Sequence, residues 1–304
     1  MSTAMPALLS IAAVERDTGL SKDTLRVWER RYGFPLPQRD ALGGRAYSPE
    51  QVDKLRLVKR LLDAGHRPGK VVALDLASLQ GLTRGPAQAA GSGLEAPYLE
   101  LLREHDVTGL RRRLHQALLA LGLERFVTEH VAPLNTAVGL AWMHGALTVG
   151  QEHVYTEALQ LVLRQAIGSI PEAAAGAPRA LLATLPQEDH GLGLLMAEAV
   201  LSLHGVHCLS LGVRVPMDDI VQAAALARTD IVALGFSASF NPQQALAALA
   251  ELRRQLPPGV ALWAGGGSAA LRKRLPAGVL PVPDIGLVPH LLKPPRQPDD
   301  PVEP

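Results

Sequence analysis

The sequence is poor in cysteine and in aromatic residues, and these shortages exclude several classes of protein. Cys208 is the one cysteine among 304 residues, so the chain can form neither an internal disulfide framework nor a metal site built from several thiolates. Aromatic residues make up 4% of the chain, whereas apolar residues make up 47%. With its abundant Ala, Leu and Gly, this composition is typical of a helix-rich α/β protein of two or three domains.

The chain also lacks any apolar run long enough to span a bilayer, and its first residues show no basic segment followed by an apolar one. We therefore expect a cytoplasmic protein with no membrane partner. The net charge is only +1, but the charged residues are unevenly distributed along the chain. Residues 10–70 hold 13 Lys and Arg against 8 Asp and Glu, and the remaining residues hold 17 against 21. A basic N-terminal module favours nucleic-acid binding.

Two short, well-capped helices are predicted near the N-terminus, over residues 11–18 and 22–32. Ser10 and Ser21 precede the two segments, and Gly19 and Gly33 follow them. Serine is a favoured residue before a helix and glycine after one. Two such helices joined by a tight turn predict a helix-turn-helix.

The second of these helices has an apolar face and a basic face. Leu25, Trp28 and Tyr32 recur at three- and four-residue spacing and predict the buried stripe. A hairpin around Gly43 and Gly44 follows as a wing, and a further helix begins after Ser48. Arginine side chains that face outward can contact phosphates and base edges. The candidate contacts to double-stranded DNA are Arg26, Arg30, Arg31, Arg45 and Tyr47.

The order of these segments resembles the winged helix-turn-helix of MerR-type transcription regulators. The resemblance rests on residues 25–35, which read LRVWERRYGFP, followed by residues 44–48, which read GRAYS. It implies a DNA-binding domain over residues 8–78. Residues 79–97, rich in Gly, Ala, Ser and Pro, predict a linker to whatever binds the effector.

Residues 98–175 predict a four-helix bundle. Trp142 is expected to end one helix of the bundle, while Glu152 and His153 lie in the first turn of the next. This geometry lets an indole, a carboxylate and an imidazole converge at one end of the bundle. The bundle helices are predicted over residues 98–105, 108–121, 124–143 and 149–169.

Residues 178–293 predict a Rossmann-like parallel sheet, because strands and helices alternate along this segment. Residues 294–304, with Pro and Asp, predict a disordered tail. The fold class is therefore multidomain, α and α/β: a winged helix-turn-helix, a four-helix bundle and a parallel sheet. Strands are predicted over residues 180–185, 207–211, 230–236 and 261–264, and helices are expected to begin near residues 192, 217, 242 and 268.

The loop after the first predicted strand holds the strongest candidate for ligand binding. Ligands dock at the carboxyl ends of the strands in open α/β sheets. His190 lies in this loop, where an imidazole could meet a cofactor, and Glu188 could orient the ring by accepting its second N–H. A carboxylate that orients an imidazole in this way is the usual arrangement around a metal-ligating histidine.

Residues 188–193, which read EDHGLG, resemble the Asp-x-His-x-x-Gly signature of cobalamin-binding domains, with Glu188 in place of Asp. Ser237 and Ser239 after the third strand, and Gly265 and Gly266 after the fourth, lie where such domains carry Ser-x-Leu and Gly-Gly elements. Ser239 stands where Leu is usual. The resemblance implies that His190 is the lower axial ligand of cobalt. It implies further cobalamin contacts at Gly193, Ser237, Ser239, Gly265 and Gly266.

The spacing of Trp142 and the Glu152–His153 pair completes a second motif. Trp142, nine residues, then Glu152 and His153 resemble the Trp-x9-Glu-His motif of the light-sensing cobalamin regulators of the CarH/LitR photoreceptor family. In that family these residues cap the upper face of adenosylcobalamin. A histidine directly after the motif tryptophan serves there as a second axial ligand, whereas this chain has Met143, followed by His144.

The resemblance implies a repressor, a homo-oligomer (dimer or tetramer), that binds adenosylcobalamin or another cobalamin and leaves DNA when light breaks the cobalt–carbon bond. It implies no enzymatic activity. Three alternatives remain open at this point. They are a sensor of the cobalamin form without a light response, a MerR-type regulator independent of cobalamin, and a corrinoid methyl-carrier protein. A methyl carrier has no use for a basic winged module, which favours the regulators.

Overall fold

The computed structural model describes residues 8–40, 43–63, 66–83, 93–143, 145–238, 240–272 and 275–292. The chain divides into two compact units. One unit holds residues 1–92 with the short segment 139–148, and the other holds residues 93–138 and 149–304. The tail predicted over residues 294–304 lies outside the described residues, as do Ser239 and His144.

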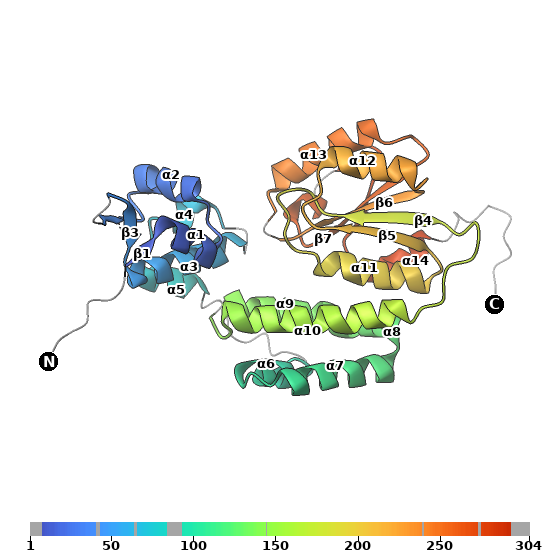
Figure 1. Ribbon diagram of the computed structural model, residues 1–304, viewed down its shortest axis with the longest axis horizontal. Helices are drawn as coiled ribbons and strands as arrows, with labels where there is room; N and C mark the ends of the chain where they lie inside the picture. The colour runs from blue at the N-terminus through green and yellow to red at the C-terminus, as the bar shows by residue number, and fades with distance from the viewer. Residues whose placement is uncertain are drawn as a thin grey trace. The chain divides into compact units, whose positions relative to one another are not determined.

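The N-terminal unit is a small helical domain with a three-stranded antiparallel sheet in the order β1-β3-β2 (Figure 1). The capping residues lie as predicted. Ser10 Oγ accepts from the N–H of Ala13 at 3.3 Å, and Ser21 Oγ accepts from the N–H of Thr24 at 3.1 Å. Its elements are β1 (Leu9–Ser10), α1 (Ile11–Thr18), α2 (Lys22–Tyr32), β2 (Gln38–Arg39), β3 (Arg45–Tyr47), α3 (Pro49–Asp63), α4 (Pro68–Val71) and α5 (Leu76–Thr83).

The core of this unit forms where α1, α2 and α3 bury their apolar stripes. Leu25 and Trp28 of α2 are buried and Tyr32 is half-buried against them, which confirms the predicted stripe. The wing around Gly43 and Gly44 is also confirmed, because β2 and β3 pair antiparallel on either side of it. Helix α5 continues to Thr83, within the segment predicted as a linker.

The second unit begins with a helical bundle. Helix α10 packs on α7 on one side and on α11 of the sheet domain on the other (Figure 1). The helix predicted over residues 124–143 is instead three pieces, and its middle turn is π-helical. Pro133, which has no N–H to donate, follows that turn closely. The bundle elements are α6 (Ala96–Arg103), α7 (Val107–Leu121), α8 (Leu123–Arg125), η1 (Phe126–Val131), α9 (Ala132–Met143) and α10 (Val149–Gly168), although the end of α9 from residue 139 is grouped with the first unit.

A five-stranded parallel sheet in the order β5-β4-β6-β7-β8 follows, with α12 and α13 on one face and α11 and α14 on the other (Figure 1). Strands β4 and β6 are almost wholly buried, as expected for central strands covered on both faces. The elements are β4 (Arg179–Ala183), α11 (Leu192–Leu203), β5 (His207–Gly212), α12 (Met217–Leu226), β6 (Ile231–Phe236), α13 (Pro242–Gln255), β7 (Ala261–Gly266), η2 (Ala269–Arg272), β8 (Val279–Val282), η3 (Ile285–Leu287) and α14 (Val288–Leu291).

The four predicted strands and the four predicted helix starts are confirmed within a few residues. Strand β8 was not predicted, because it is short and contains Pro281. Proline is tolerated there since β8 is an edge strand of the sheet. In the described part of the chain, no helix combines the length and the apolar character needed to cross a bilayer.

Candidate functional site

A cavity of about 610 Å³ opens within the second unit at the carboxyl ends of β6 and β7. Its walls come from these strand ends, from α11, from η1 and α9 of the bundle, and from the segment after β8. An open parallel sheet binds ligands at this edge. Five predicted site residues line the cavity together: His190, Gly193, Ser237, Gly265 and Gly266.

His190 is held by the buried carboxylate of Glu188, as predicted. The Nδ1 atom of His190 lies 2.6 Å from Oε1 of Glu188, whose side chain is 2% exposed, whereas the imidazole is 64% exposed. A carboxylate only accepts hydrogen bonds, so in the neutral ring Nδ1 carries the proton and Nε2 carries the lone pair. The side chain of His190 is thus oriented to ligate a metal through Nε2.

Glu188 also ties the His190 loop to the end of a neighbouring strand. Its Oε1 accepts from the backbone N–H of His190 at 3.0 Å, and its Oε2 accepts from the N–H of Ser237 at 2.7 Å. Burial raises the pKa of the Glu188 carboxyl, but the hydrogen bonds from His190 and Ser237 outweigh burial and leave the pKa below its ordinary value. Glu188 therefore stays ionised at neutral pH.

Two glycines of the cavity are required for different reasons. Gly266 has a φ of 111°, and a Cβ there would run into the carbonyl oxygen of Phe236, so the backbone of β6 and β7 demands glycine. At Gly193 a Cβ would meet no atom within 4 Å. Because Gly193 lines the cavity, its missing side chain leaves that space to a ligand.

The bundle also supplies a cavity residue that the sequence analysis did not single out. Asn135 of α9 lines the cavity, and its amide is fixed on both sides. Its Oδ1 accepts from the hydroxyl of Tyr155 at 2.5 Å, and its Nδ2 lies 3.2 Å from Sδ of Met196. A polar residue in the otherwise apolar stretch 131–135 was the available signal, but a sequence alone does not show which face of α9 meets α11.

Trp142, Glu152 and His153 lie on either side of the α9–α10 turn, as predicted. Trp142 is half-buried in the last turn of α9, and Met143 ends that helix. In the first turn of α10, Nδ1 of the exposed His153 lies 3.0 Å from Oε2 of Glu152. None of these three residues is among the described residues that line the cavity. Their convergence on a common ligand stays a prediction.

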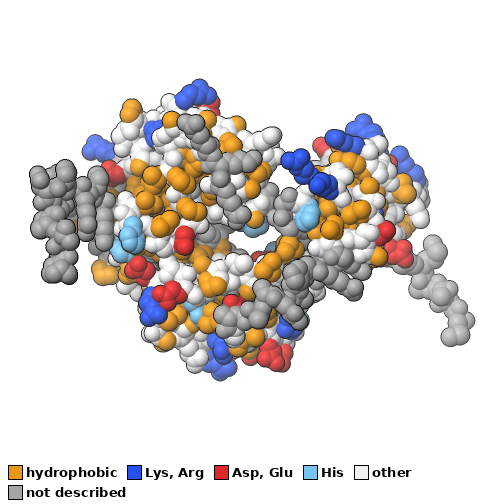
Figure 2. Space-filling model, turned by 180° about the vertical axis from the view of Figure 1, so that it is seen from behind, with side chains coloured by type: hydrophobic (Ala, Val, Ile, Leu, Met, Phe, Trp, Pro, Cys, Tyr) orange, Lys and Arg blue, Asp and Glu red, His pale blue; other side chains and the backbone are white. Residues whose placement is uncertain are grey.

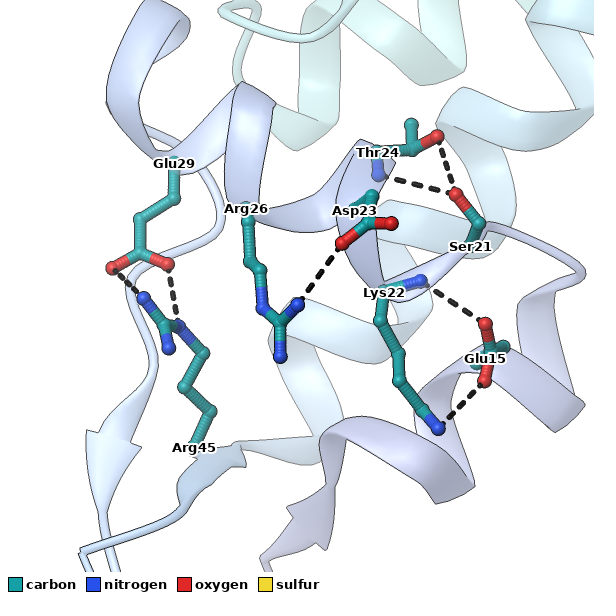
Figure 3. A network of polar contacts seen from close by, with 8 residues as sticks. All are labelled: Glu15, Ser21, Lys22, Asp23, Thr24, Arg26, Glu29 and Arg45. Carbon is teal, nitrogen blue, oxygen red and sulfur yellow. Dashed lines mark hydrogen bonds and ion pairs between the residues drawn. The ribbon is translucent and has the colours of Figure 1, made fainter.

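Helix α2 presents the predicted basic face. Arg26, Arg30 and Arg31 are exposed, and Lys and Arg side chains gather on the side of the N-terminal unit where α2 lies (Figure 2). Arg26 forms an ion pair with Asp23 at 2.9 Å, within the same helix (Figure 3). Exposed guanidinium groups along one helix suit phosphate and base contacts.

Arg45 and Tyr47 of the wing differ in whether their side chains are accessible to DNA. Arg45 is partly exposed, and its Nε lies 2.8 Å from Oε2 of Glu29, so it links the wing to α2 (Figure 3). The Tyr47 side chain is fully buried in the core of the N-terminal unit, and burial raises the pKa of its hydroxyl. The prediction that Tyr47 contacts DNA is therefore wrong, because in strand β3 its side chain points into the core.

A metal bound at His190 would need most of its ligands from a cofactor. The described residues contain no group of three or more His, Cys, Asp or Glu side chains able to hold a metal ion. A lone imidazole beside a large cavity suits a metal whose other ligands come from an organic ring. The residues present thus fit a corrinoid: an oriented imidazole, and a glycine that leaves space for the ligand.

Comparisons with known proteins agree with this geometry. Residues 9–74 match the MerR HTH family regulatory protein, and residues 94–166 and 178–279 each match a B12 binding domain. The HTH-type transcriptional repressor CarH of Myxococcus xanthus is 34% identical over 260 residues, covering 83% of this chain and 86% of that protein. The chain belongs to the CarH family. The HTH-type transcriptional repressor CarA of the same organism is 31% identical and covers 82% of this chain and 84% of its own length.

A solved structure supports the fold of the second unit. The monomethylamine corrinoid protein of Methanosarcina barkeri superposes with a TM-score of 0.52 at 17% identity, over 66% of this chain and 98% of that protein. This likeness shows the bundle-plus-sheet fold. As a CarH-family protein, the chain is a DNA-binding, cobalamin-binding regulator of transcription and not an enzyme.

Proposed function

We propose that this CarH-family protein is a repressor that binds adenosylcobalamin in the dark and leaves its promoter after illumination. The observation that carries the proposal is the pair Glu188–His190, in which a buried carboxylate fixes an exposed imidazole that lines the cavity. We assign DNA binding to residues 8–78, the cap to residues 98–175 and cofactor binding to residues 178–293, with 79–97 as the linker.

The residues of this chain have distinct tasks in the proposal. His190 ligates cobalt through Nε2, and Glu188 holds the ring in that tautomer. Gly193, Ser237, Ser239, Gly265 and Gly266 accommodate the nucleotide tail. Adenosylcobalamin supplies a cobalt–carbon bond that light can break.

Trp142, Glu152 and His153 are proposed to cover the adenosyl group from the bundle. Their contacts exist only while that group is bound, so its loss removes a preference for the repressing state. In the repressing state the protein is a dimer or a tetramer, in which several winged domains bind one DNA together. Such multivalent binding amplifies a modest change in assembly.

Met143 favours a second candidate function. A thioether is a weaker ligand than imidazole for oxidised cobalt, so the illuminated state lacks a strong second protein ligand at this position. A protein that senses which form of cobalamin is present, without responding to light, would have the same lower site. The two candidates share the role of His190 and differ only in the effect of illumination.

An absorption titration tests the proposal. The wild type, His190→Ala and the control His207→Ala, an exposed histidine of β5, are each titrated with adenosylcobalamin in darkness and then illuminated with green light. We expect a dark spectral change in the wild type and in the control, but not in His190→Ala. We expect a second change on illumination. A wild type that never takes up the cofactor would refute cobalamin sensing, and DNA occupancy that is indifferent to illumination would select the second candidate.

A further inference from the structure

The loop that carries His190 is fastened to a neighbouring loop by a residue outside the cobalamin signature. Thr184 directly follows β4, and it is completely buried. Its backbone N–H donates to the carbonyl of Gly212 at 3.0 Å, and its carbonyl accepts from the N–H of Val215 at 2.9 Å. Thr184 thus connects the end of β4 to both ends of the loop after β5.

The hydroxyl of Thr184 extends this connection to the His190 loop itself. It donates to the backbone carbonyl of Glu188 at 2.8 Å and accepts from the backbone N–H of Arg214 at 3.0 Å. The Thr184 hydroxyl therefore donates one hydrogen bond and accepts another, and these two bonds join the His190 loop to the loop after β5. Glu188, whose position this bond fixes, is the residue whose carboxylate orients the imidazole of His190.

The loop after β5 also supports both neighbours of His190 directly. The Arg214 guanidinium forms an ion pair with Asp189. A Cβ at Gly191 would come within 2.9 Å of the Val213 side chain, so the two loops are closely packed there. Arg214 has a φ of 58°, in the left-handed region, at the residue whose N–H donates to the Thr184 hydroxyl.

The Thr184 hydroxyl and the Arg214–Asp189 ion pair both connect the two loops, but they differ in burial and therefore in strength. The side chains of Arg214 and Asp189 are 63% and 56% exposed, and exposed ion pairs contribute little. The Thr184 hydroxyl is buried, and its removal would leave a carbonyl and an N–H without their partner. The hydroxyl therefore contributes more to the coupling between the loops than the ion pair does.

We propose that Thr184 is a positioning residue for His190, which holds the loop of residues 185–191 so that the imidazole faces its metal. The proposal rests on the proposed function of His190 as the cobalt ligand. A ligand held in place before binding coordinates more tightly than one that must be ordered on binding. The loop after β5 thereby becomes part of the cobalamin site, although in the described residues it does not line the cavity.

Three substitutions distinguish a positioning role of Thr184 from a general contribution to the stability of the fold. Thr184→Val keeps the shape and removes the hydroxyl, and Thr184→Ser restores it. Thr229→Val is the matched control. Thr229 is 5% exposed in the same sheet domain, and its Oγ1 donates to the carbonyl of Ala224 at 3.0 Å, away from the His190 loop.

The first measurement is amide hydrogen exchange of the full-length, cobalamin-free protein. We expect exchange in residues 185–191 to become about tenfold faster in Thr184→Val, and to stay at the wild-type rate in Thr184→Ser and Thr229→Val. An equal increase in Thr184→Val and Thr229→Val would show general destabilisation and overturn the proposal, as would no increase in Thr184→Val.

The second measurement is the dark titration with adenosylcobalamin, read at the spectral change that His190→Ala lacks. We expect the midpoint to rise about tenfold in Thr184→Val and to be unchanged in the other two variants. A wild-type midpoint in Thr184→Val would overturn the positioning role. If the wild type itself shows no such change, the function proposed for His190 is wrong, while hydrogen exchange still decides whether Thr184 holds the loop.

Discussion

Glu188 is a charged side chain that the fold shields from water, with 2% of the side chain exposed. A buried carboxylate is stable only when hydrogen bonds replace its hydration, and three N–H groups do so: the ring and backbone of His190 and the backbone of Ser237. The same bonds that keep Glu188 ionised also fix the His190 ring. Stability and ligand geometry thus depend on one residue.

Glu188→Gln tests this dependence through pH. The folded pKa of Glu188 lies below its ordinary value of 4.5, so the stability it contributes is fully present above about pH 4.5 and is lost as the pH falls through the folded value. A glutamine offers one acceptor group in place of two. We expect urea unfolding at about pH 7 to show a loss of about 1–3 kcal/mol in the variant, with the difference shrinking at acidic pH. A difference that grows as the pH falls would contradict the assignment.

Tyr47→Phe tests whether Tyr47 of the wing is a core residue that does not contact DNA. The Tyr47 hydroxyl is buried and has no hydrogen-bond partner among the described residues. Removing an unsatisfied buried hydroxyl leaves stability unchanged or raises it by about 1 kcal/mol. We expect thermal unfolding to show this and a DNA titration to give wild-type affinity. A large loss of affinity without a loss of stability would restore Tyr47 as a DNA contact.

At the scale of elements, the sequence predicted those that local pattern determines. Helix caps at Ser10 and Ser21, the buried stripe of α2 and the parallel sheet all followed from spacing and composition. The side on which each wing residue lies was not predictable, because a two- or three-residue strand has no periodicity to read. Tyr47 was misplaced for that reason.

The residues of the candidate site also fall into those that the sequence predicted and those that it did not. His190 and Glu188 were predictable because a strand, a polar loop and a helix follow one another in the sequence. Asn135 and Thr184 were not, since their partners lie on other elements. The π-helical turn before α9 was missed because its residues keep an ordinary helical pattern.

Gly193 of α11 and Gly266 of β7 give predictions for stability and for cobalamin binding. Gly193→Ala adds a methyl group in open space on a helix, so we expect stability to stay constant or rise by about 0.5–1 kcal/mol, while cobalamin binding weakens. Gly266→Ala forces a Cβ against the backbone of β6, and we expect a loss of about 1–3 kcal/mol. Thermal unfolding and the dark titration measure both. Full cobalamin affinity in Gly193→Ala would show that the cavity is not the cofactor site.

Helix α2 gives the prediction for DNA binding. Arg30 is exposed on the basic face, so Arg30→Ala should weaken binding and lower the slope of affinity against salt by about 1 if it contacts one phosphate. Arg112→Ala, an exposed arginine of α7, is the control and should change neither quantity. Equal effects of the two substitutions would mean that charge alone, and not the face of α2, determines binding.

In the whole molecule, one chain combines a DNA-binding domain with a cobalamin-binding domain. Neither domain alone explains regulation, because a ligand shifts an equilibrium only through contacts that differ between two states. In our proposal that difference is the adenosyl group, which Trp142, Glu152 and His153 cover while His190 holds the cofactor. DNA occupancy should then follow the state of the cofactor.

A gel-shift titration tests this coupling most directly. The probe is a duplex enriched from a random pool by the wild-type protein with adenosylcobalamin in darkness. We predict tight binding by the wild type only with adenosylcobalamin in darkness, at least tenfold weaker binding after green light, and weak binding by His190→Ala under every condition. Equal occupancy by the wild type and His190→Ala, with or without cofactor and light, would contradict the account.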